Sequence, residues 1–452
     1  MSVAEYLRSN REKSLEELNE LLRIPSVSAK SEHNADTAAA AEWLAARMRA
    51  AGMQTVEVAP TAGHPVVIGE WRGAPGAPTL LVYGHYDVQP PEPLDEWHTP
   101  PFEPTVRDGK LFARGSVDDK GQVYLHLKAV EAHLATHGAL PVNVVFLLEG
   151  EEEVGSPNLS TFLTEHAGRL KCDAVLISDT TMFAPGLPSV TIGLRGLAYM
   201  EIRVQGPATD LHSGAYGGAV VNPANALAKI IAQLHDENGR VNIPGFYDRV
   251  RDLTTEERAA IAKLPFEEEG LREEVGAPKL GGEAGYGPLE RIWARPTLDV
   301  NGLLSGYTGE GAKTVLPARA MAKVSMRLVP DQDFREVEKL FIDHVRSLAP
   351  EGVTVEAVAL HGGQPWYAEP TGPVIEAARR ALAKAFGKEP VFIREGGSIP
   401  IVQQFQEILG APAVLIGFGL PGENAHAPNE WMSVDNFHQG AEAIALLYEE
   451  LR

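Results

Sequence analysis

The chain has 452 residues, of which 44% are apolar, and a formal net charge of −21. This length predicts two or three domains, and the apolar share excludes a wholly disordered chain. The negative charge disfavours nucleic acid and anionic membranes as partners, because both would repel it. The single cysteine, Cys172, excludes an intrachain disulfide and a zinc site made of several thiolates.

Helices and then buried strands are predicted along the first part of the chain. A helix is expected over residues 37–51 and ends at Gly52, which adopts left-handed backbone without strain. Nearly continuous apolar runs predict strands that are buried on both faces, and helical patterns such as residues 122–137 separate several of them. These runs lie at residues 79–83, 142–148, 174–177 and 413–417. The alternation predicts an α/β domain.

The middle of the chain has a different pattern. Apolar and polar residues alternate over residues 198–204 and 320–328, which indicates a half-exposed, antiparallel sheet. Helices near residues 223–235 and 334–348 are expected to cover its other face. This change of pattern predicts a second domain inserted into the first. The first domain would comprise residues 1–195 and 370–452, and the inserted domain residues 196–369. Residues 236–295 are charged and rich in turns, and their structure is left unassigned.

Side chains that bind metals follow the buried strands. His85 and Asp87 come after the first of them and point to the same side of an extended chain. A carboxylate beside a ligating histidine can accept its other ring proton. Further acids and one histidine stand at Asp118-Asp119, Glu149–Glu153, Asp179 and His426. Taken singly, such segments are more commonly polar loops, helix starts or solvated acidic faces.

Together, these segments place two histidines and several carboxylates at one edge of the predicted sheet, where open α/β sheets form their sites. An oxygen-rich set with two imidazoles and no sulfur suits two divalent ions of the zinc, manganese or cobalt type. Two metals bridged by a carboxylate can activate a water molecule. A serine hydrolase is disfavoured because the sequence has no Gly-x-Ser-x-Gly turn, and a His-Glu-x-x-His zinc helix is also absent.

The order of the motifs resembles the di-metal metallopeptidase family that includes carboxypeptidase G, aminoacylase, succinyl-diaminopimelate desuccinylase and the carnosinases. Six segments carry this resemblance: Gly84-His85-Tyr86-Asp87-Val88, Asp118-Asp119-Lys120-Gly121, Glu152-Glu153-Val154-Gly155-Ser156, Ile177-Ser178-Asp179, Asp210-Leu211-His212-Ser213-Gly214 and Arg394-Glu395-Gly396-Gly397-Ser398-Ile399-Pro400. With aspartate and not glutamate at position 179, the chain resembles most the branch of carnosinases and nonspecific cytosolic dipeptidases. The resemblance implies an α/β fold with a mixed, mostly parallel sheet flanked by helices, and an inserted α+β lid and dimerisation domain on an antiparallel sheet.

The resemblance also implies a metal centre and a general base. Five residues would ligate two metal ions per chain, with Zn²⁺ favoured over Mn²⁺ or Co²⁺: His85, Asp118, Glu153, Asp179 and His426. Asp118 would bridge the ions, with His85 and Asp179 on one and Glu153 and His426 on the other. Asp87 would orient His85, and Glu152 would be the general base. The peptide bond between Asp118 and Asp119 is expected to be cis.

Substrate contacts are implied from the inserted domain. Arg327 would bind the terminal carboxylate of the substrate, a task that suits its two-pronged guanidinium group. His212 would stabilise the developing oxyanion, and in a homodimer it would act in the active site of the partner chain. On pattern alone, Arg327 is an ordinary exposed arginine and His212 a loop histidine. Three further positions match substrate contacts of the family: Thr314, His361 and Ser398.

The leading functional hypothesis is hydrolysis of the peptide bond of dipeptides or very short peptides, by a metal-activated water and without a covalent intermediate. One alternative is an N-acyl amino acid deacylase or desuccinylase that uses the same metal centre. Another is a non-catalytic binding protein on a hydrolase fold, which the presence of every implied ligand and of Glu152 disfavours. Since no signal peptide and no membrane span is evident, a cytoplasmic location is expected.

Overall fold

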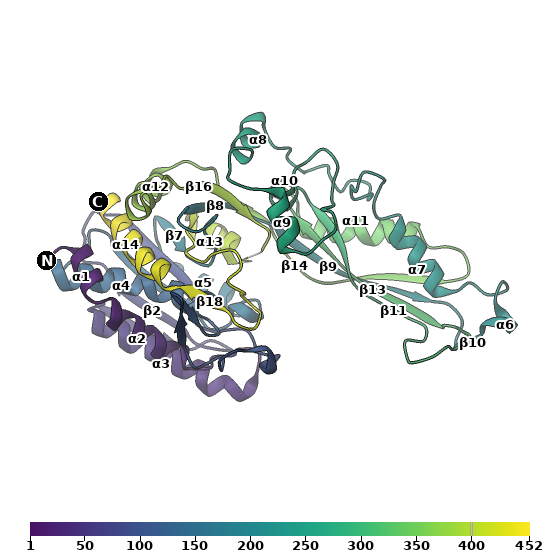
Figure 1. The fold of residues 1–452 in the computed structure, drawn as a ribbon, viewed down its shortest axis with the longest axis horizontal. Helices are drawn as coiled ribbons and strands as arrows, with labels where there is room; N and C mark the ends of the chain where they lie inside the picture. The colour runs from purple at the N-terminus through teal and green to yellow at the C-terminus, as the bar shows by residue number, and fades with distance from the viewer. Residues whose placement is uncertain (398, 400) are drawn as a thin grey trace. The chain divides into compact units, whose positions relative to one another are not determined.

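The structure, a computed structural model, describes residues 1–397, 399 and 401–452. It contains two compact units (Figure 1). The first comprises Met1–Ile192, Ala368–Ile393 and Ile401–Arg452, and the second comprises Gly193–Tyr367 and Arg394–Pro400. The segment from Arg394 therefore groups with the second unit, although the sequence places it in the first. The guanidinium group of Arg394 pairs with Glu257 and lies 5.0 Å from the ring centroid of Tyr367. Both of these residues belong to the second unit.

The first unit is built on a mixed sheet. The strand order of this sheet is β1-β2-β6-β3-β7-β17-β8-β15, and β16 pairs with β8; by its residue range, the last strand of this order, β15, falls in the second unit. The four middle strands, β6, β3, β7 and β17, are parallel, whereas the other pairs along the order are antiparallel. The strands are β1 Thr55–Ala59, β2 Val66–Trp71, β3 Thr79–His85, β6 Asn143–Glu149, β7 Ala174–Ile177, β8 Ser189–Leu194, β15 Trp366–Tyr367, β16 Val391–Glu395 and β17 Ala413–Leu415. The mixed sheet confirms the predicted fold class.

Helices cover this sheet. Helix α4 is buried along most of its length because it lies between β3 and the helices α1, α2, α3 and α14. Helix α3 ends at Gly52, whose φ of 95° confirms the predicted left-handed stop. The helices are α1 Val3–Ser9, α2 Arg11–Leu22, α3 Asn34–Ala51, α4 Lys120–His137, α5 Leu159–His166, α12 Pro373–Phe386, α13 Ile401–Leu409 and α14 Val434–Glu450. A small antiparallel sheet joins β4 Thr105–Arg107, β5 Lys110–Phe112 and β18 Trp431–Ser433.

The second unit contains an antiparallel sheet in the order β11-β13-β9-β14. Alternate residues, such as Met200 and Met326, are buried against α7 and α11, as the period-two pattern predicts. The strands are β9 Gly196–Gln205, β11 Thr297–Ser305, β13 Arg319–Leu328 and β14 Thr354–Gly363. The covering helices are α7 Pro223–Ala232 and α11 Phe334–Ser347. Within the described residues, α7 and α11 pack on the same face of the sheet, and the opposite face is the more exposed one.

Short elements complete this unit. The pair β10 Leu211–His212 and β12 Val315–Leu316 leads into α6 Ser213–Tyr216. The segment that the sequence leaves unassigned forms three short helices, α8 Thr255–Ile261, α9 Glu268–Glu274 and α10 Pro288–Ala294. Figure 1 shows α6 and β10 at one end of the second unit and α8 and α10 at the other. Within the described residues, every helix is too short or too polar to cross a bilayer.

Candidate metal centre

The candidate site forms where three parallel strands end. In the sheet register, His85 at the end of β3 lies opposite Glu149 at the end of β6. Asp179 stands two residues after β7, the strand on the other side of β3. Parallel strands present their carboxyl ends at one edge of a sheet, so the segments that follow them meet there. The topology thus brings together residues that are nearly a hundred positions apart in sequence.

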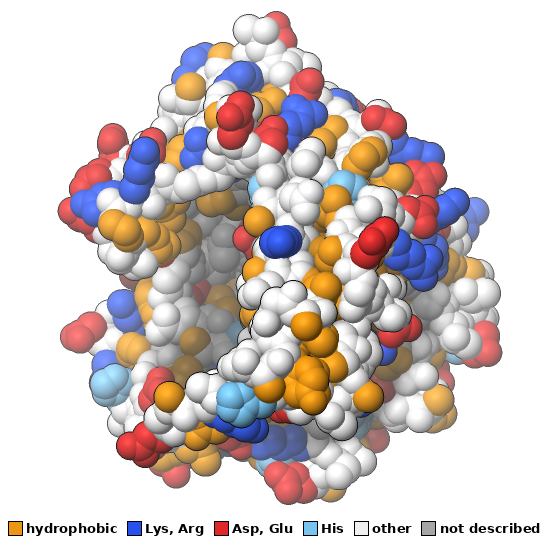
Figure 2. All heavy atoms as spheres, turned by 90° about the vertical axis from the view of Figure 1, so that its right-hand side faces the viewer, with side chains coloured by type: hydrophobic (Ala, Val, Ile, Leu, Met, Phe, Trp, Pro, Cys, Tyr) orange, Lys and Arg blue, Asp and Glu red, His pale blue; other side chains and the backbone are white. Residues whose placement is uncertain are grey.

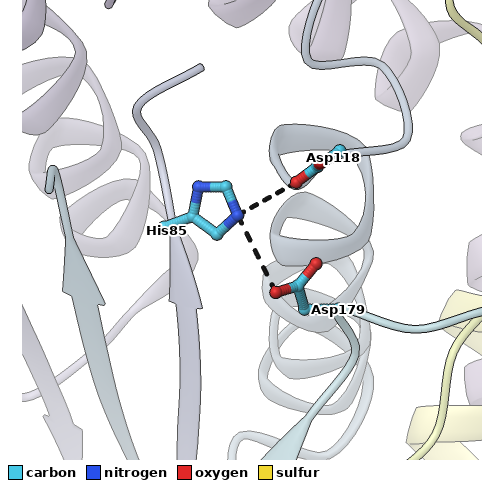
Figure 3. A group of neighbouring side chains, drawn as sticks. All are labelled: His85, Asp118 and Asp179. Carbon is cyan, nitrogen blue, oxygen red and sulfur yellow. Dashed lines mark ion pairs between the residues drawn. The ribbon is translucent and has the colours of Figure 1, made fainter. Parts of the chain in front are cut away.

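The first group of ligand atoms comes from His85, Asp118 and Asp179 (Figure 3). Nε2 of His85 lies 3.1 Å from Oδ1 of Asp118 and 3.9 Å from Oδ2 of Asp179. The other ring nitrogen, Nδ1, lies 3.1 Å from the main-chain oxygen of Asp87, which can only accept a hydrogen bond. Nδ1 therefore keeps its hydrogen, and the buried Nε2, without a hydrogen-bond partner among the described residues, is the nitrogen that can ligate.

The second group consists of Asp118, Glu153 and His426. Nε2 of His426 lies 2.8 Å from Oδ2 of Asp118 and 3.3 Å from Oε2 of Glu153. The second oxygen of Glu153, Oε1, is buried without a hydrogen-bond partner in the described part of the chain. Asp118 thus turns one oxygen to each group, which is the arrangement of a carboxylate that bridges two cations. The peptide bond between Asp118 and Asp119 is cis, as expected from the resemblance.

Asp87 connects the first histidine to the acidic turn η3, Glu152–Val154. Its Oδ1 lies 3.4 Å from Nδ1 of His85 and accepts the N–H of Glu152 at 3.2 Å. Its Oδ2 accepts the N–H of Glu153 at 3.1 Å and the hydroxyl of Ser28 at 2.6 Å. This fully buried carboxylate therefore holds His85, Glu153 and Glu152, two candidate ligands and the candidate base, in one cluster.

The charges of the cluster shift the pKa values of its members. Burial alone would raise the pKa of Asp118, but its contacts with the imidazoles of His426 and His85 outweigh this effect and lower the pKa. Contacts with the carboxylates of Asp118 and Glu153 raise the pKa of His426 to about 10. Burial raises the pKa of Asp179 well above its usual value, and the neighbouring Asp119 and Asp118 add to this shift. The site therefore has an excess of buried negative charge, which bound cations would compensate.

Glu152 lies beside the cluster but belongs to neither group of ligand atoms. Burial raises its pKa to about 7, and the neighbouring carboxylates of Glu153, Asp118 and Asp87 add to the shift, while His85 opposes it. A carboxylate with a pKa near neutrality is suited to accept and return a proton at physiological pH.

The predicted substrate residues fall into two pairs within the second unit. His212 and Thr314 meet where β10 joins β12, with the N–H of Ser213 donating to the main-chain oxygen of Thr314 at 3.1 Å. Arg327 and His361 lie on the exposed face of the larger sheet, and the ring of His361 stacks on that of Tyr199 at 5.0 Å. The structure does not bring these pairs together within one unit, since β10 lies at one end of it (Figure 1). Ser398 lies outside the described residues.

One arginine of this unit has no role in the sequence interpretation. Arg195 and Arg327 line a cavity of about 600 Å³, together with Thr297, Asp299 and Ser325. Burial lowers the pKa of Arg195 to about 10, and the positive charge of Arg327 adds to this effect. Two like charges side by side favour binding of an anion between them. The sequence signal was weak because Arg195 stands between the strands β8 and β9, outside the alternating pattern.

The chain matches the sequence model of Peptidase family M20/M25/M40 over residues 81–450. It is 36% identical over 393 residues to the Cys-Gly metallodipeptidase dug1 of Schizosaccharomyces pombe. This alignment covers 86% of this chain and 83% of the relative. It is 34% identical over 395 residues to the human Beta-Ala-His dipeptidase, and this alignment covers 86% of this chain and 77% of the relative.

A solved structure, that of the M20 family metallo-carboxypeptidase Sso-CP2 from Sulfolobus solfataricus, superposes with a TM-score of 0.86 at 36% identity. The alignment covers 97% of this chain and 99% of that one. The family resemblance inferred from the motifs is confirmed. Since the match spans most of the chain, which also carries two groups of residues able to hold metals, the chain belongs to peptidase family M20/M25/M40 and is a metallohydrolase.

Proposed function

We propose that this protein hydrolyses the peptide bond of dipeptides at a centre of two divalent metal ions. The ligands would be His85 and Asp179 on one ion and Glu153 and His426 on the other, with Asp118 on both. The observation that carries this proposal is that the two oxygens of Asp118 face different groups: Oδ1 faces His85 and Oδ2 faces His426. Dipeptide substrates agree with the relatives, a Cys-Gly metallodipeptidase and a Beta-Ala-His dipeptidase. The deacylase alternative is not favoured.

The donor set supports Zn²⁺ as the ion, with Mn²⁺ and Co²⁺ as substitutes. Each group combines one imidazole with two carboxylates and no thiolate, a borderline set that these metals share. When bound, such ions polarise the scissile carbonyl and lower the pKa of a bound water.

Glu152 is then the general base that takes the proton of the attacking water and returns it to the leaving amine. Its position next to the cluster, outside the ligand groups, and its raised pKa support this role. His212 stabilises the oxyanion that forms on the substrate. Its Nδ1 accepts the N–H of Gly214 at 3.0 Å, which leaves the proton on the exposed Nε2 as a donor.

Arg327 binds the free carboxylate of the substrate, and Arg195 strengthens that site. Both guanidinium groups line the same cavity, and a carboxylate between them would relieve their mutual repulsion. Thr314, His361 and Ser398 provide further substrate contacts. A free terminal carboxylate distinguishes short peptides and the ends of longer ones from internal peptide bonds.

The active enzyme is proposed to be a homodimer in which His212 serves the metal centre of the partner. Figure 2 views the molecule from the side of α6, and apolar side chains are exposed on that face. Large exposed apolar side chains of the second unit are Tyr216, Val221, Val275, Val300, Leu303, Leu304, Tyr307 and Leu360. Exposed apolar surface of this kind supports self-association. The cytoplasmic location remains a prediction.

A carboxypeptidase activity on longer peptides is the second candidate, because the Sulfolobus relative of 36% identity is a metallo-carboxypeptidase. Enzyme stripped of metal with a chelator and reloaded with Zn²⁺, Mn²⁺ or Co²⁺ would be assayed on dipeptides, tripeptides, and acetyl and succinyl amino acids. We expect metal-dependent cleavage of dipeptides above the rest. Faster release of the last residue from tripeptides would favour the carboxypeptidase, and turnover of acyl amino acids alone would overturn both.

A further inference from the structure

Glu430 is a fully buried carboxylate that none of the proposed steps uses. It lies directly before β18, four residues after the ligand candidate His426. Its side chain enters the loop that carries Asp118, and its main-chain oxygen accepts the N–H of Ala113 at 3.1 Å. Glu430 therefore joins two segments that are more than 300 positions apart in sequence.

Both oxygens of Glu430 accept two hydrogen bonds. Oε2 accepts the N–H of Gly115 at 2.9 Å and Nη1 of Arg114 at 2.7 Å. Oε1 accepts the N–H of Val117 at 3.0 Å and that of Asp118 at 3.2 Å. The guanidinium of Arg114 is itself 1% exposed, so the charge pair is out of contact with water. All four acceptor positions are engaged by donors, an arrangement that suits a carboxylate.

The segment on the other side of this contact is held in an unfavourable backbone conformation. Asn424, His426 and Asn429 have φ values of 57°, 62° and 61°, in the left-handed region that residues other than glycine seldom adopt. Such residues persist where their surroundings determine them. The side chain of Asn429 supplies part of this support, since it accepts the N–H of His98 at 2.7 Å and donates to the main-chain oxygen of Glu96 at 2.8 Å.

We infer that Glu430 is a positioning residue that fixes the backbone of Asp118 relative to the loop of His426, and so sets the distance between two metal ligands. This inference rests on the proposed function, because it takes Asp118 and His426 as ligands. A side chain that only stabilised the fold would not need to accept a hydrogen bond from the N–H of Asp118, the proposed bridging ligand. Outer-shell partners of metal ligands typically change metal affinity 10- to 100-fold when they are removed.

The test compares two substitutions that each disturb a buried charge pair. Glu430→Gln keeps the size of the side chain but places an NH₂ group where an oxygen accepts two donors. The matched control is Glu17→Gln, because Glu17 is 5% exposed and pairs with Lys128, which is 1% exposed, between α2 and α4. Both variants should lose thermal stability. Zn²⁺ affinity is measured by competition with a chromophoric chelator, and the Co²⁺-loaded proteins are compared by their visible absorption spectra.

We expect Glu430→Gln to weaken Zn²⁺ binding by about 10- to 100-fold and to change the Co²⁺ spectrum, whereas Glu17→Gln keeps the parent values of both. Parent affinity and an unchanged spectrum in folded Glu430→Gln would overturn the inference. If that variant does not fold, Glu430→Asp, which keeps the charge but withdraws the oxygens by one methylene, replaces it with the same criteria. Failure of the parent protein to bind two metals would instead overturn the proposed function.

Discussion

The N–H of Glu152 donates a hydrogen bond of 3.2 Å to Oδ1 of Asp87. The same oxygen lies 3.4 Å from Nδ1 of His85, so the proposed base and the first proposed metal ligand share one fixed point. Displacing Asp87 would therefore disturb proton transfer and metal binding together.

Asp87→Asn is expected to lower kcat by about 10- to 100-fold with little change in KM, since the effect passes through His85 and Glu152 and not through the substrate. In this variant an amide NH₂ would face backbone donors on one side. Ser28→Ala is the control, because the hydroxyl of Ser28 also donates to Asp87, at 2.6 Å, but leaves the carboxylate in place. Steady-state kinetics at saturating Zn²⁺ check this prediction, and equal losses in both variants would contradict it.

Glu152→Gln and Glu153→Gln should separate the base from the ligand. Removing the base is expected to lower kcat by about 10²- to 10⁴-fold while both metals stay bound. Glu153→Gln should instead lower the metal content, because its carboxylate lies 3.3 Å from His426 in a ligand group. Metal analysis by atomic emission beside kcat decides between them. The reverse pattern would mean that the two roles are exchanged.

Arg327→Ala is expected to raise KM for dipeptides with a free carboxylate by about tenfold to a hundredfold, the loss of a charge-assisted pair of roughly 1.5–3 kcal/mol. Arg195→Ala should act in the same direction to a smaller extent. Lys323→Ala is the control, because it removes another cation of the same strand, one that pairs with Glu201. Dipeptide amides should be poor substrates of the parent and insensitive to the change. Equal cleavage of free and amidated dipeptides would remove Arg327 from this role.

Metal binding should strengthen as the pH rises and should release protons. An imidazole must lose its proton to ligate, and contacts with Asp118 and Glu153 raise the pKa of His426 to about 10 in the metal-free protein. The raised pKa of Asp179 acts in the same direction, since this carboxylate also binds a metal only when ionised. Calorimetric titration with Zn²⁺ near pH 7, in buffers of different ionisation enthalpy, measures the released protons. Binding without proton release would contradict the assigned ligands.

Mixed dimers test whether His212 acts across chains. Homodimers of His212→Ala and of Glu152→Gln should both be nearly inactive. After co-expression, random pairing makes half of the dimers hybrids with one complete site of two, so about a quarter of the parent activity should return. If His212 served its own chain, no hybrid would contain a complete site and mixing would restore nothing. A monomer at assay concentrations would also defeat the proposal.

Several features were determined by the sequence alone. Continuous apolar runs predicted β3, β6, β7 and β17, because strands covered on both faces have no polar side. Strict alternation predicted β9 and β13, because one face of their sheet is exposed. Gly52 marked the end of α3 by its freedom at positive φ. The acids and histidines after the strands, with the order of the motifs, indicated a metallohydrolase. These signals are local, so the sequence carries them without knowledge of what lies nearby in space.

Other features were decided only by the tertiary structure. The two-sided contact of Asp118, the shared cavity of Arg195 and Arg327, and the burial of Glu430 all depend on segments that are remote in sequence. Residue type gave Glu430 no distinction, since a lone glutamate in a loop is ordinarily solvated. The distances between side chains from different loops follow from the packing of the sheet and its helices, and no pattern along a single segment contains that information.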